Sequence, residues 1–306
     1  MRLTVDGRGL TDDGLDAMKA GLSAMGQAEA TVIVTDRFVD TVRGLTSQTE
    51  YSTARGSGEV AARTVHANNE STVVVNAEVA RMRPTGDIER LLAHEAGHIQ
   101  LNERGEGPEG RRNLVSAEWE WLLLCVGALA LDEFRIERSL AGLGYPIAET
   151  ATIPSAELAL HHLNVEVMEA LLDPANAADP RRLSEAIART HDWYSKHLAY
   201  FAAFRSGLAG TGLAGLSARG KQDWDDYVGD TWPGRLELYA SVPTSLESIN
   251  EAGLNDLLRQ AGQQEAALLS KIGFRYSTQG NGYSFKRVIT DAHCATRIQR
   301  ASSRPR

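Results

Sequence analysis

The stretch Leu91-Leu92-Ala93-His94-Glu95-Ala96-Gly97-His98-Ile99-Gln100-Leu101 places the pattern H-E-x-x-H between apolar residues. Residues four apart share one face of a helix, so His94 and His98 can present two imidazole nitrogens to one metal ion. Zinc suits such a site because it binds imidazole and carboxylate and keeps one position for water. Glu95 stands next to the first ligand, where it can take a proton from that water. The stretch therefore predicts a helix with a catalytic zinc site and Glu95 as general base.

The residues before this helix predict a small mixed sheet. The β-branched run Thr72-Val73-Val74-Val75-Asn76 is typical of a strand, and it comes directly before the helix. Other strands are predicted at 2–6, 31–35 and 60–67, with helices at 10–25 and 36–43. The first hundred residues therefore combine helices and strands.

The rest of the chain is predicted to be mainly helical, at about 114–140, 155–172, 180–205, 220–229 and 245–270. The Gly-rich stretch Gly207–Gly220 lacks a phosphate-loop pattern and is interpreted as a flexible connector. The chain after Ile272 is polar, and we expect a partly disordered tail. The predicted fold class is α+β, with a domain that carries the H-E-x-x-H motif at 1–145, a helical domain or extension at 146–271 and a tail at 272–306.

Composition excludes several classes of protein. The 306 residues carry a formal net charge of −8, and no basic stretch dominates, which argues against a nucleic-acid partner. Cys125 and Cys294 are the only cysteines, so a reducing cytoplasmic location fits. The start lacks the apolar run of a signal peptide, and the longest apolar run is shorter than the about 20 residues that span a membrane. Arginine outnumbers lysine 27 to 5, which is typical of a GC-rich bacterial genome.

A third metal ligand should come from the long helix that follows. Glu133 adjoins the apolar run 122–131, where a buried carboxylate needs a metal or an ion partner, and Glu137 shares its helix face and could orient a histidine. Glu118 and Glu120 are competing candidates. Because Glu118 and Glu133 lie about 22 Å apart along one helix, they cannot bind the same ion. We favour Glu133; the alternative is a local ion-pair network with the arginines of segment 131–138.

With strand, H-E-x-x-H helix and acidic helix in this order, the chain resembles zincin metallopeptidases of the glutamate-ligand (gluzincin-like) kind. Val74-Val75-Asn76 ahead of Ala93-His94-Glu95-Ala96-Gly97-His98 also resembles the ImmA/IrrE-like peptidases. The resemblance implies His94, His98 and Glu133 as zinc ligands, Glu95 as general base, and a peptide or protein substrate. It further implies that residues 72–77 or a neighbouring strand form a sheet edge that pairs with an extended peptide.

The function expected from these residues is zinc-dependent hydrolysis of a peptide bond, by an intracellular peptidase of narrow specificity or regulatory role. One alternative is a protein that retains zinc but only binds or senses. Another is a helical interaction protein in which the motif is coincidental. The pairs His161-His162 and His191/His197 do not share helix faces, so surface or capping roles are expected. One of these histidines, Tyr145 or Arg135 could stabilise the oxyanion. Substrate and oligomeric state have no signal in the sequence.

Overall fold

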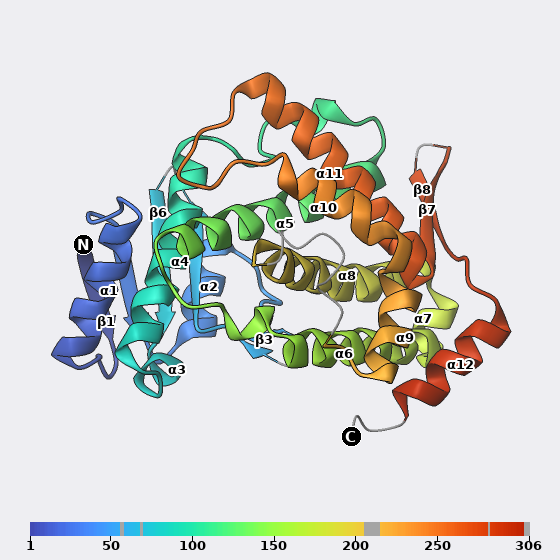
Figure 1. The fold of residues 1–306 in the computed structure, drawn as a ribbon, viewed down its shortest axis with the longest axis horizontal. Helices are drawn as coiled ribbons and strands as arrows, with labels where there is room; N and C mark the ends of the chain where they lie inside the picture. Colours follow the sequence, from blue (N-terminus) through green and yellow to red (C-terminus); the bar gives the residue numbers. More distant parts are fainter. Residues whose placement is uncertain (56–57, 68–69, 205–214, 281, 303–306) are drawn as a thin grey trace. The chain divides into compact units, whose positions relative to one another are not determined.

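The computed structural model describes residues 1–55, 58–67, 70–204, 215–280 and 282–302. Its fold is α+β, as predicted: the N-terminal part contains a mixed four-stranded sheet with helices, and the C-terminal half is mainly helical (Figure 1). Within the described ranges, no helix is both long and apolar enough to cross a membrane. The chain divides into two compact units, the first made of Met1–Gly107, Arg135–Pro146 and Pro243–Ser248, the second of Pro108–Phe134, Ile147–Val242 and Ile249–Arg306.

The sheet of the first unit has the spatial order β1 (Arg2–Asp6), β2 (Thr31–Thr35), β6 (Glu70–Asn76) and β5 (Ala62–Ala67). The first three strands are parallel, whereas β5 runs antiparallel to β6. Val74 of β6 is aligned with Ile33 on one side and Arg63 on the other, so both edges of β6 are occupied. The sheet edge is therefore not formed by residues 72–77 but by the neighbouring strand β5. A separate hairpin joins β3 (Ala54–Arg55) to β4 (Gly58–Glu59).

Helices cover both faces of this sheet because its strands alternate apolar side chains between the two faces. The helices of the first unit are α1 (Asp12–Ala24), α2 (Phe38–Thr46), α3 (Ala77–Arg81) and α4 (Thr85–Glu103). Val73 and Val75 belong to the core cluster that contains Leu92 of α4, whereas Val74 packs with Phe38 of α2. This alternation places α4, which carries the H-E-x-x-H motif, over the sheet next to β5 and β6 (Figure 1).

Helix α5 (Glu118–Gly142) begins four residues later than the predicted start at 114. A 3-10 turn at Arg112–Leu114 precedes it, and Glu120 accepts hydrogen bonds from the main-chain N–H groups of Ser116 and Ala117 at 2.9 and 2.8 Å. These two bonds satisfy N–H groups that a helix start otherwise leaves without acceptors. The part of α5 up to Phe134 belongs to the second unit, and the part from Arg135 onward belongs to the first.

The second unit consists mainly of helices. They are α6 (Ile153–Leu172), α7 (Pro174–Ala178), α8 (Pro180–Ala203), α9 (Ala218–Tyr227), α10 (Trp232–Ala240) and α11 (Glu251–Ile272), with 3-10 turns at Glu149–Ala151 and Gly229–Thr231. Four correspond to predicted helices, whereas α7 and α10 were not predicted. The predicted connector Gly207–Gly220 lies mostly outside the described residues, and its last three residues already belong to α9, which Ser217 caps.

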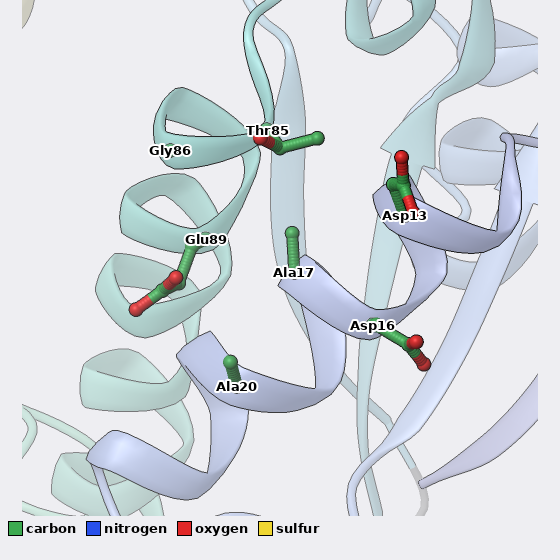
Figure 2. A pocket seen from close by; sticks show the side chains of 7 residues that line it. All are labelled: Asp13, Asp16, Ala17, Ala20, Thr85, Gly86 and Glu89. Carbon is green, nitrogen blue, oxygen red and sulfur yellow. The ribbon is translucent and has the colours of Figure 1, made fainter.

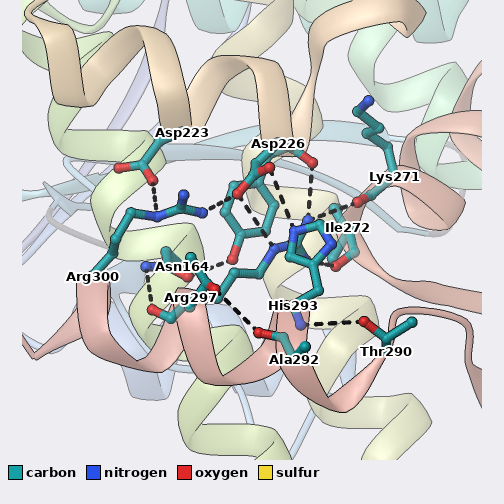
Figure 3. A network of polar contacts seen from close by, with 12 residues as sticks. Asn164, Asp223, Asp226, Lys271, Ile272, Thr290, Ala292, His293, Arg297 and Arg300 are labelled. Atoms are coloured by element: carbon teal, nitrogen blue, oxygen red, sulfur yellow. Dashed lines mark hydrogen bonds and ion pairs between the residues drawn. The ribbon is translucent and has the colours of Figure 1, made fainter.

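The C-terminal segment differs from the expected polar tail, because it forms a hairpin of β7 (Phe274–Gln279) and β8 (Gly282–Arg287) followed by α12 (Asp291–Ala301). The rings of Phe274 and Phe285 stack with centroids 5.2 Å apart. Arg297 is fully buried and donates to the carbonyl groups of Ile272 and Lys271 at the end of α11 (Figure 3). An arginine that looks solvated in the sequence thus satisfies carbonyl groups that the helix end leaves free.

Candidate metal site

Three side chains that can bind a metal lie together around helix α4. The donor atoms of His94, His98 and Glu133 all lie within 4.8 Å of one another. His94 and Glu133 are buried, and the rings of the two histidines have centroids 5.0 Å apart. Four-coordinate zinc holds its ligand atoms about 3.4 Å apart, which is compatible with donor atoms that all lie within 4.8 Å of one another. Two imidazoles and one carboxylate are a donor set that fits zinc.

Glu137 contacts the Nδ1 atom of His94 and thereby orients its ring. Its Oε1 atom lies 2.9 Å from Nδ1 of His94, and its Oε2 atom accepts a hydrogen bond from Arg90. The side chain of Glu137 is completely buried. Because Nδ1 of His94 contacts this carboxylate, His94 would bind a metal through Nε2. The sequence singled out Glu137 for this role because it shares a helix face with Glu133.

The competing carboxylates have partners of their own. Glu118 is exposed and lies 3.4 Å from Arg112, and Glu120 accepts the hydrogen bonds at the start of α5. We also considered an ion-pair network within segment 131–138. Arg135 instead forms an ion pair outside this segment, with Glu106 at 2.7 Å. Within the part of the chain that the structure describes, Glu133 is therefore the carboxylate that joins the two histidines.

Glu95 is buried and is held by strand β5. The hydroxyl group of Thr64 lies 2.7 Å from Oε2 of Glu95 and 3.0 Å from its main-chain oxygen. Thr64 shares its strand face with Ala62, which packs in the core under α4. Sequence reasoning missed Thr64, because the alternation in β5 indicates a face but not which helix covers it.

Gly97, the fourth residue of the motif, lets two helices approach closely. A Cβ atom at this position would lie 2.7 Å from Cγ1 and 2.9 Å from Cγ2 of Ile136 in α5. Ile136 stands one residue before Glu137, so the same close approach brings Glu137 to His94. Gly97 thereby contributes to the site without any chemical group of its own.

Tyr200 of helix α8 contacts the proposed third ligand directly. Its hydroxyl group donates a hydrogen bond to Oε2 of Glu133 at 2.8 Å. The two residues are 67 positions apart, and no pattern in the sequence links them. Tyr200 is therefore a second residue of this region that sequence reasoning missed.

The other histidines and the candidate oxyanion donors are placed as follows. His191 was expected at the surface or at a cap, but it is fully buried with Nε2 at 2.8 Å from Glu265, which corrects that prediction. Burial lowers the pKa of His197 to about 4, so this ring is neutral at pH 7.

The candidate oxyanion donors form other contacts. The hydroxyl of Tyr145 donates a hydrogen bond to Glu89 at 2.9 Å. Tyr145 and His191 thus have partners of their own, and so has Arg135.

A pocket elsewhere in the first unit is acidic. It lies between α1 and α4 and is lined by Asp13, Asp16, Ala17, Ala20, Thr85, Gly86 and Glu89 (Figure 2). Two of its carboxylates are already engaged, since Asp16 pairs with Lys19 at 2.8 Å and Glu89 accepts the hydroxyl of Tyr145. This pocket offers no histidine, so the triad remains the better candidate for a metal.

Comparison with protein-family models, with curated proteins and with solved structures gave no match for this chain. The resemblance to zincin metallopeptidases therefore depends on the H-E-x-x-H motif and on the residues that the fold brings to it. What the structure adds is a His-His-Glu group that could bind a metal ion.

Proposed function

We propose that this chain is a zinc-dependent peptidase, with His94, His98 and Glu133 as zinc ligands and Glu95 as general base. The observation that supports the proposal most strongly is the approach of three donor atoms within 4.8 Å of one another, two of them from the helix α4 that also carries Glu95. Bound zinc supplies a Lewis acid that activates water and polarises a carbonyl group. The substrate class is a peptide or protein, and we expect a narrow range of substrates.

Glu95 would move the proton in this reaction. Its Oε2 atom accepts a hydrogen bond from the hydroxyl group of Thr64. The other carboxylate oxygen, Oε1, would receive the proton of the attacking water. The same carboxyl group would then deliver the proton to the amine that leaves. Burial of Glu95 excludes bulk water from competing for its oxygens.

The edge strand β5 provides a place for the substrate backbone. Among the described residues, β5 pairs only with β6. We propose that an extended peptide pairs with its other edge. Such a peptide would add a strand to the sheet, with main-chain hydrogen bonds giving affinity. Because Thr64 lies on β5 and contacts Glu95, the bound backbone would run past the general base.

The substitution Glu95→Gln tests the proposal. We expect it to keep one zinc ion per chain, measured by elemental analysis, and to reduce hydrolysis by about 100-fold or more because the proton acceptor is lost. Hydrolysis is followed by mass spectrometry on a mixture of unstructured peptides. Glu89→Gln is the matched control, because it makes the same change on the same helix at a carboxylate bonded to Tyr145; it should keep both zinc and activity.

Other outcomes would contradict the proposal in different ways. Full activity of Glu95→Gln would exclude Glu95 as the general base. A wild-type chain that retains zinc but cleaves no peptide would favour a binding or sensing protein. A wild-type chain that takes up no zinc when zinc is supplied would leave the triad without a metal and remove the basis of the proposal.

A further inference from the structure

We propose that Tyr200 of helix α8 is a positioning residue for Glu133 and thereby sets the affinity of the site for zinc. This inference rests on the metal site of the proposed function but not on its peptidase activity. Its basis is the hydrogen bond of 2.8 Å that the Tyr200 hydroxyl donates to Oε2 of Glu133. Glu133 is only 8% exposed, so little water is available to replace this donor.

The packing around both residues holds this contact in place. The side chains on either side of Tyr200 and Glu133 belong to one core cluster, made of Ala130, Leu131 and Phe134 of α5 and Ala199, Ala202 and Ala203 of α8, with Leu238, Tyr239 and Ala261. Alanine side chains of both helices pack in this cluster, and the ring of Phe134 stacks on Tyr239 with centroids 4.3 Å apart. The hydroxyl of Tyr200 is therefore presented from a packed helix and not from a loop.

A fixed hydroxyl changes how Glu133 can bind a metal. The hydrogen bond from Tyr200 to Oε2 restricts the orientation of the Glu133 carboxylate. Orientation of the carboxylate before the ion arrives removes part of the entropy cost of binding. Hydrogen-bond partners of metal ligands typically change metal affinity by about 10- to 100-fold when they are removed. Tyr200 thus does for Glu133 what Glu137 does for His94.

The test compares zinc affinity of the full-length chain with and without this hydroxyl. We expect Tyr200→Phe to raise the zinc dissociation constant about tenfold or more, measured by competition with a chromogenic chelator. The visible absorption spectrum of the Co²⁺-loaded chain should change as well, because the carboxylate is free to bind differently. The matched control is Tyr276→Phe, which removes a hydroxyl that shares a 2.8 Å hydrogen bond with buried Ser184; it should change neither readout.

A double substitution separates positioning from general loss of stability. In a chain that carries Glu133→Ala, adding Tyr200→Phe should not weaken zinc binding further, because Tyr200 acts through Glu133. Equal dissociation constants and spectra for Tyr200→Phe and wild type would overturn the inference, and so would an equal loss of affinity in Tyr276→Phe. Zinc binding that depends on Tyr200 in a chain without peptidase activity would contradict the proposed function alone.

Discussion

Thr64 contributes to the proposed site through a single hydroxyl group, which contacts both the carboxylate and the main-chain oxygen of Glu95. We expect Thr64→Val to slow peptide hydrolysis about tenfold or more, because valine keeps the shape but lets the carboxylate leave its position. Zinc content should stay at the wild-type value, since Thr64 contacts no ligand in the triad. Initial rates at a saturating concentration of a cleaved peptide measure the effect.

Thr64→Ser provides the control for this prediction, because serine restores the hydroxyl and removes only a methyl group. Its rate should lie close to that of the wild type. If Thr64→Val and Thr64→Ser hydrolysed the peptide at the same reduced rate, the packing of the side chain and not its hydrogen bond would explain the effect.

The residues of the site differ in how far the sequence could predict them. His94, Glu95 and His98 follow from spacing, because residues four apart share a helix face. Glu133 was favoured over Glu118 by its apolar surroundings, and the structure brings it to the histidines. Thr64 and Tyr200 had no signal, because their partners lie 31 and 67 residues away on other elements.

At the scale of elements, Gly97 controls how closely α4 packs on α5. We expect Gly97→Ala to lower the free energy of unfolding by about 1–3 kcal/mol, because the new methyl group would meet both branches of Ile136. This loss should exceed the gain of up to about 1 kcal/mol that alanine brings to a helix. Urea unfolding with a chelator present measures the change without a contribution from bound zinc.

Gly86 in the first turn of the same helix is the matched control, because a Cβ atom there would meet nothing within 4 Å. Gly86→Ala should leave stability unchanged or raise it slightly. A Gly97→Ala chain as stable as Gly86→Ala would show that α4 and α5 can move apart without cost, and that the close approach does not matter.

Strong periodicity explains which elements were predicted correctly. The β-branched runs at 31–35 and 72–76 form β2 and β6, and the motif helix forms α4. The C-terminal segment was misjudged because its apolar residues are few and far apart. Phe274 and Phe285 become buried when the hairpin stacks their rings on one another, and Arg297 becomes buried when α12 meets the end of α11.

At the scale of the whole molecule, the first unit is built from three segments that lie far apart in the sequence. Arg135 donates to the carbonyl of Pro243, 108 residues further along, and Ser139 contacts Ser245 at 2.7 Å. Buried Arg135 also pairs with Glu106, so one side chain joins three segments of the first unit. Contacts over such separations leave no periodic pattern in the sequence, which is why the fold class could be predicted but not these connections.

The second unit depends on a buried charge pair in its core. Glu265 is 1% exposed and accepts a hydrogen bond of 2.7 Å from Arg235, which is 2% exposed. Glu265 also contacts His191 and Ser195. Burial alone would raise the pKa of Glu265, but the charge of Arg235 and the hydrogen bonds from His191 and Arg235 lower it to about 2. The folded state therefore holds this carboxylate ionised at a pH where an unfolded chain would protonate it.

This shift predicts how stability depends on pH. Because the folded pKa lies below the usual value of 4.5, the stability that Glu265 contributes is complete above that value and is lost as pH falls toward about 2. Glu265→Gln should lower the free energy of unfolding at pH 7 by about 3–5 kcal/mol, because it leaves Arg235 buried without a counter-charge. The difference between wild type and variant should then shrink between about pH 4.5 and 2.

Denaturant titrations of both chains at pH 7, 4 and 3 test this prediction, with Glu185→Gln as the control. Glu185 pairs with Arg181 at 3.0 Å, but its side chain is 57% exposed. An exposed pair contributes about 0–1 kcal/mol, so this variant should follow the wild type at every pH. If Glu265→Gln also ran parallel to the wild type down to pH 3, the buried pair would not be the group whose protonation destabilises the chain in acid. The source would then lie among the carboxylates nearer the surface.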